Sequence, residues 1–164
     1  MLTLPPLALY IHLPWWERKC PYCDFNSCQR ETEPPFAAYA ARLLDDLEQD
    51  LGFVAGRAVG SVFIGGGTPS LFPAEVVASL LAGVRERLAL APDAEITLEA
   101  NPGSAEAGRF RGYRAAGVNR LSIGVQSFAD TCLRALGRVH DARAPHAATA
   151  VAPDPGPAAR NNAL

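Results

Sequence analysis

The sequence has almost no lysine and no basic stripe. Lys19 is its single lysine, and the net charge of the 164 residues is −2 at pH 7. A protein that binds nucleic acid needs clustered positive charge to neutralise the phosphates. The composition therefore argues against nucleic acid as a main partner of this chain.

A long apolar run and a signal peptide are also missing. The N-terminal stretch MLTLPPLALYIHLP contains two early prolines and no basic n-region of lysine or arginine, so it fits neither a secretory signal nor a transmembrane span. We therefore expect a cytoplasmic protein with no transmembrane segment. In that reducing compartment the four cysteines are more typical of thiols or metal ligands than of disulfides.

Apolar segments rich in strand-forming residues alternate with helical patterns. The predicted strands cover residues 7–13, 59–65, 95–101 and 120–128. The predicted helices cover residues 34–54, 73–90 and 104–117, and a fourth begins at Asp130. This alternation predicts an α/β fold with a parallel sheet, and the apolar strand centres favour strands covered on both faces. Ligands of such sheets bind at the carboxyl ends of the strands.

The character of the sequence changes after about Asp141. The remaining stretch has no periodic apolar face and consists largely of alanine, proline and arginine. Such a composition cannot bury enough apolar surface to fold. We therefore expect residues 1–142 to be folded and residues 143–164 to be a disordered tail.

Two cysteines, Cys20 and Cys23, have C-x-x-C spacing. This pattern is compatible with a thioredoxin-like redox pair, half of a zinc site or part of an iron-sulfur site. The second cysteine pair or histidine pair of a zinc site is missing from the sequence. Cys28 follows five residues after Cys23, and we expect Cys132, in a helical stretch, to be a small core residue.

Three further motifs stand at the ends of predicted strands. The glycines of GGGTPS, residues 65–70, allow close approach of the backbone to a ligand, although a plain β-α turn explains them as well. Glu99 in TLEANP and Gln126 in GVQSF are candidates for contacts to a ribose or an amine, or are simply solvated side chains. His12 and Asp24 are expected to be structural.

Taken together, five stretches between residues 10 and 140 resemble the radical S-adenosylmethionine superfamily. They are YIHLPW…ERKCPYCDFNS, VFIGGGTPS, TLEANP, LSIGVQSF and LRALGRVH, and they occur in the family's order. Within the superfamily they are most similar to HemW-type heme chaperones, which are relatives of oxygen-independent coproporphyrinogen III oxidase. The resemblance implies a partial (β/α) barrel, of which residues 1–142 would be the N-terminal part, with about four β-α units.

The same resemblance implies a function and a set of site residues. HemW-type proteins bind a [4Fe-4S] cluster and S-adenosylmethionine and pass heme to an acceptor protein. Cys20 and Cys23 match the second and third of the three cysteines, spaced C-x3-C-x2-C, that hold the cluster. The implied cofactor contacts are Gly66, Gly67 and Thr68 for the methionine amino group, Glu99 for the ribose, and Tyr10, Tyr22 and Gln126 for other parts of S-adenosylmethionine.

The sequence departs from the family pattern at two positions. Trp16 stands where the first cluster cysteine belongs, and an indole N–H is a donor that cannot coordinate iron. Phe25 replaces a cysteine of the oxidases, which favours the chaperone branch. We therefore expect little or no cluster binding, with heme delivery impaired by Trp16 and by the shortness of the chain. An oxidase and a zinc or thiol module remain as alternatives, and whether the chain is an enzyme stays open.

Overall fold

The fold is built on a five-stranded parallel sheet. The computed structural model describes residues 3–16, 20–29, 32–102, 104–138, 143 and 160–162. The strands lie in the order β1, β4, β5, β6, β7, and their bounds are Leu7–Leu13, Val59–Gly66, Leu90–Ala100, Arg120–Ile123 and Arg160–Asn162. The predicted α/β fold with a parallel sheet is thereby confirmed.

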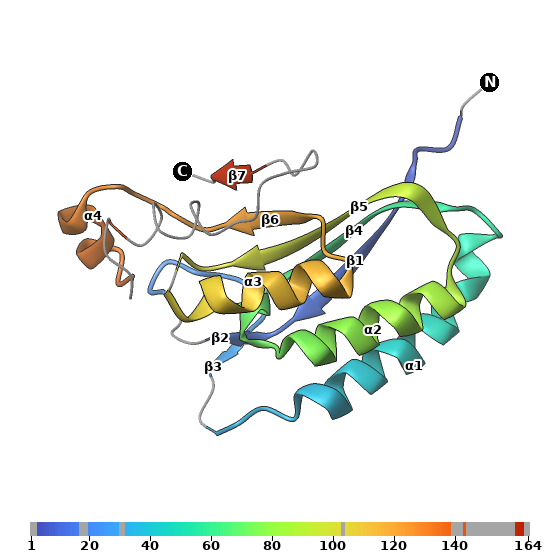
Figure 1. Ribbon diagram of the computed structural model, residues 1–164, viewed down its shortest axis with the longest axis horizontal. Helices are drawn as coiled ribbons and strands as arrows, with labels where there is room; N and C mark the ends of the chain where they lie inside the picture. Colours follow the sequence, from blue (N-terminus) through green and yellow to red (C-terminus); the bar gives the residue numbers. More distant parts are fainter. Residues whose placement is uncertain are drawn as a thin grey trace.

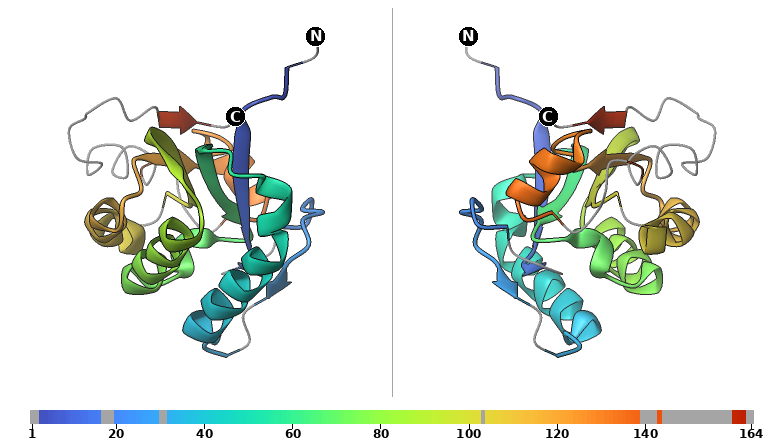
Figure 2. Two further views of the ribbon diagram at one scale, coloured as in Figure 1. Left: turned by 90° about the vertical axis from the view of Figure 1, so that its right-hand side faces the viewer. Right: turned by 90° about the vertical axis from the view of Figure 1, so that its left-hand side faces the viewer.

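The helices lie mainly on one side of this sheet. Their bounds are Phe36–Val54 for α1, Ala74–Arg87 for α2, Ser104–Ala116 for α3 and Asp130–Ala135 for α4. Figures 1 and 2 show α1, α2 and α3 side by side against one face, whereas α4 lies beyond the carboxyl end of β6. Each helix falls where the sequence predicted one. α1 begins after two prolines, and Ala55, with a left-handed φ of 52°, caps its C-terminus.

The two faces of the sheet carry different side chains. The face under the helices buries aliphatic residues that alternate along the strands, namely Ile11, Leu13, Val62, Ile64, Ile96, Leu98 and Ile123. The opposite face carries polar and aromatic residues, namely Tyr10, His12, Phe63, Thr97, Glu99, Arg120 and Ser122. Tyr10 there is 57% exposed. The expected coverage of both faces holds only in part, because Thr97 on this face is fully buried whereas Tyr10 is exposed.

The segment before the cysteines is held by two short strands that the sequence analysis did not predict. β2 (Trp15–Trp16) pairs in parallel with β3 (Cys28–Gln29), so that Trp15 lies beside Cys28. The ring of Trp15 packs in a cluster with Phe36, Tyr39 and Phe72, with its centroid 4.8 Å from that of Tyr39. Because successive side chains of a strand point to opposite sides, Trp16 faces away from this cluster.

Most of the tail predicted as disordered, residues 143–164, lies outside the described residues. Residue 143 and residues 160–162 are the exceptions, and residues 160–162 form β7, which pairs in parallel with β6. The backbone groups of the β6 edge find partners there, which a disordered tail would not supply. The boundary near residue 142 stays a prediction.

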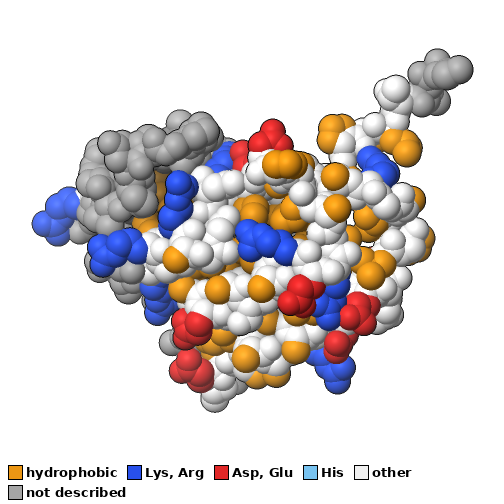
Figure 3. Space-filling model, turned by 45° about the vertical axis from the view of Figure 1, so that its right-hand side comes forward, with side chains coloured by type: hydrophobic (Ala, Val, Ile, Leu, Met, Phe, Trp, Pro, Cys, Tyr) orange, Lys and Arg blue, Asp and Glu red, His pale blue; other side chains and the backbone are white. Residues whose placement is uncertain are grey.

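Two observations bear on possible partners of the fold. Acidic and basic side chains are interspersed on the face displayed in Figure 3, so the described part of that face carries no basic stripe. Among the helices of the described residues, none combines the length and the apolar character that crossing a bilayer requires.

Tyr113 of α3 fixes the turn that follows β4. Its side chain is fully buried, and its hydroxyl donates to the carbonyl oxygens of Ser70 and Phe72, each 2.8 Å away. Tyr113→Phe removes this donor, so we expect the free energy of unfolding to fall by about 1–3 kcal/mol in urea titrations followed by circular dichroism. Tyr39→Phe is the control, because its half-buried hydroxyl makes one bond, of 3.1 Å, to the His12 carbonyl. An equal loss in both variants would contradict the prediction.

Candidate functional site

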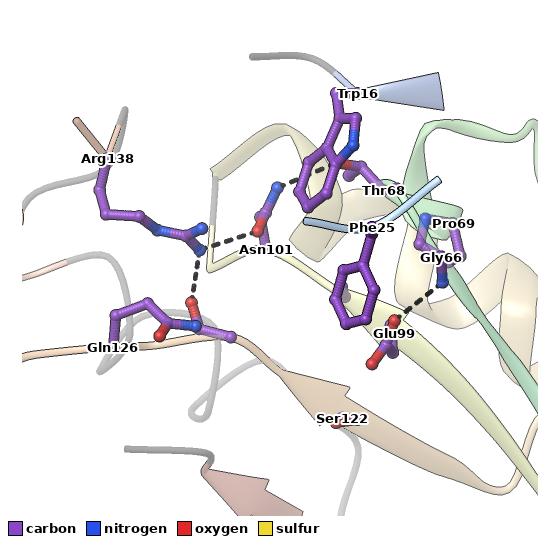
Figure 4. A pocket seen from close by; sticks show the side chains of 13 residues that line it. Trp16, Phe25, Gly66, Thr68, Pro69, Glu99, Asn101, Ser122, Gln126 and Arg138 are labelled. Carbon is purple, nitrogen blue, oxygen red and sulfur yellow. Dashed lines mark hydrogen bonds between the residues drawn. The ribbon is translucent and has the colours of Figure 1, made fainter. Parts of the chain in front are cut away.

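A pocket opens at the carboxyl ends of β4, β5 and β6. Its volume is about 270 Å³. Figure 4 shows side chains from these three strand ends, from the cysteine segment and from the residues after α4 converging on it. The residues that line it are Trp16, Phe25, Gly66, Gly67, Thr68, Pro69, Glu99, Ala100, Asn101, Ser122, Gly124, Gln126 and Arg138. Five of them, Gly66, Gly67, Thr68, Glu99 and Gln126, belong to the predicted cofactor contacts.

The glycine segment at the end of β4 packs against the chain itself. The N–H of Gly67 donates to the Leu13 carbonyl at 2.8 Å, and the N–H of Thr68 donates to the Trp15 carbonyl at 2.7 Å. A Cβ on Gly67 would lie 2.8 Å from the carbonyl oxygen of Pro14. The glycines are therefore needed for contact with the segment that leads to the cysteines, and these N–H groups are engaged within the chain.

Glu99 points into the pocket from the end of β5 (Figure 4). Its Oε2 accepts a hydrogen bond of 3.2 Å from the N–H of Gly66. Burial raises the pKa of the Glu99 carboxyl, and the Gly66 N–H and the nearby His12 offset part of that rise. This pKa is higher in the folded chain than in the unfolded chain. The protein is therefore destabilised as the pH rises from the unfolded pKa through the folded pKa, because Glu99 must ionise in a buried place, and there is no such cost below the unfolded pKa.

Tyr10 lies near Glu99, outside the pocket lining. Its hydroxyl is 3.1 Å from Nδ1 of His12, and its ring stacks on Phe63 with centroids 6.1 Å apart. A Cβ on Gly65 would lie 3.0 Å from Glu99 Oε2 and 3.1 Å from the Tyr10 ring. The glycine therefore lets both side chains approach each other across β4. His12 Nε2 is 2.7 Å from the Asn26 carbonyl oxygen, which fits the structural role expected of His12.

Gln126 lies in a turn that ends β6 earlier than predicted. The N–H of Gly124 donates to the Ala100 carbonyl, and the N–H of Val125 donates to the Ile123 carbonyl, each at 3.0 Å. These bonds replace the sheet ladder, so that β6 ends at Ile123 rather than at 128. Gln126 then has a φ of 65°, which is uncommon for a residue with a side chain and places it at the pocket.

Arg138 and Asn101 connect the parts of the site, and the sequence analysis missed both. Arg138 donates to the Gly124 carbonyl at 2.7 Å, to Asn101 Oδ1 at 3.0 Å and to Cys20 Sγ at 3.5 Å. Asn101 donates in turn to Thr68 Oγ1 at 3.4 Å. Both residues lie in the stretches that carry the family resemblance, but their spacing does not say which side chain reaches which partner.

The cysteines do not form one group. Cys20 is 5% exposed and Cys23 is half-buried, and the N–H of Cys23 donates to the Cys20 carbonyl at 3.0 Å. Tyr22 lies beside Cys20. The pKa of the Tyr22 hydroxyl is raised, mainly by burial and to a smaller extent by its interaction with Cys20. Cys28 is exposed on β3. The prediction that Cys132 is a core residue is wrong, because the short α4 buries Leu133 and leaves Cys132 exposed.

Trp16 fills the side of the pocket next to the cysteine segment. It is 7% exposed, and its Nε1 is buried with no hydrogen-bond partner in the described chain. Burying an N–H donor without an acceptor costs free energy. No group of three His, Cys, Asp or Glu side chains that could hold a metal ion occurs in the described ranges. The residues present therefore do not fit a [4Fe-4S] cluster with three cysteine ligands.

Comparison with known proteins identifies similar chains. Residues 10–149 match the radical SAM superfamily. The heme chaperone HemW of Escherichia coli is 58% identical over 140 residues, which are 85% of this chain and 37% of that protein. The bovine mitochondrial radical S-adenosyl methionine domain-containing protein 1 is 47% identical over 83% of this chain and 30% of its own length.

A solved structure is similar as well. The radical SAM enzyme coproporphyrinogen III oxidase (HemN) of Escherichia coli superimposes with a TM-score of 0.73 at 33% identity, over 90% of this chain and 34% of that chain. The chain thus spans less than two fifths of the length of these relatives.

Proposed function

The chain belongs to the radical SAM superfamily, and from this we propose that it forms the S-adenosylmethionine-binding part of a HemW-type heme chaperone, which would pass heme to an acceptor protein. The similarity to HemW of Escherichia coli supports the chaperone branch. Phe25, in place of a cysteine of the oxidases, supports it too. When bound, S-adenosylmethionine supplies a nucleoside and a charged amino acid to the pocket.

The observation that carries the proposal is the convergence of polar groups on one pocket. Glu99 offers a carboxylate that accepts hydrogen bonds from ribose hydroxyls, and Gln126 offers an amide from the neighbouring strand end. The Arg138 guanidinium, at the same pocket, suits the carboxylate of the amino acid portion. These groups bind and orient the ligand. The misfit of the cluster at Trp16 means that no electron transfer step is assigned to this chain.

We expect Glu99→Gln to weaken S-adenosylmethionine binding about tenfold to hundredfold. The amide keeps the shape of the carboxyl group but removes the charge that accepts the ribose hydrogen bonds. A hydrogen bond to a charged group contributes about 1.5–3 kcal/mol, and about 1.4 kcal/mol corresponds to tenfold in affinity. Isothermal titration of the whole purified chain with S-adenosylmethionine measures the change.

Glu95→Gln is the matched control for this substitution. Glu95 lies on the same face of β5 as Glu99 but does not line the pocket. Its carboxylate accepts a hydrogen bond of 3.0 Å from the Thr97 hydroxyl. Its replacement should change the affinity less than about twofold. Equal losses in both variants would contradict the role of Glu99, and no measurable binding by the unaltered chain would contradict the proposed function itself.

The oxidase alternative is favoured by one observation, the structural similarity to coproporphyrinogen III oxidase. That activity would release 5′-deoxyadenosine from S-adenosylmethionine under anaerobic reducing conditions. We expect no such release from this chain, because its described residues do not supply the ligands of the cluster. Chromatographic detection of deoxyadenosine would favour the oxidase over the chaperone.

A further inference from the structure

Cys20 and Cys23 sit in a tight turn without the third ligand that a cluster needs. We propose that these two thiols form an intramolecular disulfide by exchange with a small disulfide such as glutathione disulfide. The pair would then be a thiol-disulfide site in this chain rather than a set of iron ligands. This inference goes beyond the proposed function and depends on neither S-adenosylmethionine nor heme.

The backbone of the turn brings the two cysteines close together. The N–H of Cys23 donates to the Cys20 carbonyl at 3.0 Å, which closes a four-residue turn. In a β-turn the first and last Cα atoms are less than about 7 Å apart, and disulfides span Cα separations of about 4.4–6.8 Å. The Cα separation of this turn therefore overlaps the range that a disulfide spans.

The surroundings of the two sulfur atoms give them different roles. Cys23 is half-buried, so a small disulfide in solution reaches it first. Cys20 is 5% exposed, and its Sγ lies 3.5 Å from Arg138 Nη1 at the base of the turn. Cys20 is shielded from direct attack by solvent reagents and is suited to be the second, resolving thiol.

The other two cysteines are less suited to pair with this turn. Cys28 is held on β3, where its residue pairs with Trp15 and its N–H donates to the Pro14 carbonyl at 2.9 Å. Cys132 is exposed on α4. Trp16 supplies an indole where the family has a further thiol, and within the described residues no group of three metal-binding side chains includes Cys20 and Cys23 and would protect them from oxidation.

The exchange balances in two steps. The deprotonated Cys23 sulfur attacks one sulfur of glutathione disulfide, which forms a mixed disulfide and releases one glutathione thiolate. The deprotonated Cys20 sulfur then attacks the Cys23 sulfur of the mixed disulfide, which forms the intramolecular bond and releases the second glutathione thiolate. The two cysteines lose two electrons and two protons in total, and glutathione disulfide is reduced to two glutathione molecules.

Thiol counting on the whole chain tests the proposal. The double variant Cys28→Ser, Cys132→Ser keeps only the two thiols of the turn, because the sequence contains four cysteines. We expect glutathione disulfide to lower the alkylatable thiols of this variant from two to none, and peptide mapping to find one bond between Cys20 and Cys23. In the unaltered chain peptide mapping should find the same bond between Cys20 and Cys23, and any glutathione taken up should be on the exposed Cys28 and Cys132.

The matched control adds Cys23→Ser to the double variant, which leaves only the shielded Cys20 thiol. It should show no intramolecular bond. A lasting mixed disulfide on Cys23, a bond from Cys23 to Cys28 in the unaltered chain, or two free thiols in the treated double variant would each overturn the proposal. If the variants fail to fold, peptide mapping of the unaltered chain still tests the proposal. Because no S-adenosylmethionine is present, failure here is distinct from failure of the proposed function.

Discussion

Trp16→Cys is expected to raise the iron content of the chain from less than about one to about four atoms per chain after anaerobic reconstitution with iron and sulfide. The substitution removes an indole that occupies the pocket side of β2 and supplies a third thiolate at the spacing that the family uses. Metal analysis and the visible absorbance of iron-thiolate bonds measure the gain. The unaltered chain should show little of either.

Trp16→Ser is the matched control for this experiment. It opens the same space and loses the same indole packing, but a hydroxyl does not replace a thiolate as a ligand of an iron-sulfur cluster. Far-ultraviolet circular dichroism of both variants checks that they are equally folded. A full cluster in the unaltered chain, or equal iron in the serine and cysteine variants, would show that Trp16 does not decide cluster binding.

Gly67→Ala is expected to lower the free energy of unfolding by about 3 kcal/mol, at the upper end of what overpacking usually costs. The new methyl group would contact the carbonyl group of Trp15, with 2.7 Å to its carbon and 2.8 Å to the Pro14 carbonyl oxygen. Both are backbone atoms, which cannot rotate away as a side chain can. The end of β4 must therefore separate from the segment before the cysteines, and S-adenosylmethionine binding should weaken as well.

Gly52→Ala provides the comparison. Gly52 lies in α1, and a Cβ added to it would have nothing within 4 Å. Alanine is the better helix former, so this substitution should stabilise the chain by up to about 1 kcal/mol. Urea titrations of the two variants should therefore shift in opposite directions. A Gly67→Ala midpoint within error of the unaltered chain would mean that the close approach seen here is not required.

The elements of the fold were largely predictable from the sequence because its apolar pattern is regular. The helix of residues 36–54 follows from helical periodicity, and the strand of residues 7–13 follows from a short apolar run rich in strand-forming residues. The strand pattern failed at β6, where the turn at Gln126 is fixed by hydrogen bonds to the neighbouring strand end. It also failed at residues 15–16 and 28–29, because two-residue strands are too short to show any period.

The sequence predicted which motifs form the site, but not which hydrogen bonds join them. The positions of Gly66 and Glu99 at adjacent strand ends follow from the parallel order of the sheet, and the structure brings both to one pocket. The role of the N–H groups of Gly67 and Thr68 did not follow, because their partners, the carbonyl groups of Leu13 and Trp15, lie in a distant, earlier segment of the chain. Arg138 was missed for a related reason: nothing local to an arginine after α4 indicates that it reaches Cys20.

The order of the strands implies an order of assembly during synthesis. β4, β5 and β6 each pair with the strand of this sheet that precedes them in the sequence, so each of these strands can pair with one that has already been synthesised. Arg138, which joins Cys20, Asn101 and the turn after β6, is made after all of these units. A nascent chain halted before it would have a sheet and helices in place while its ligand pocket was still missing one wall.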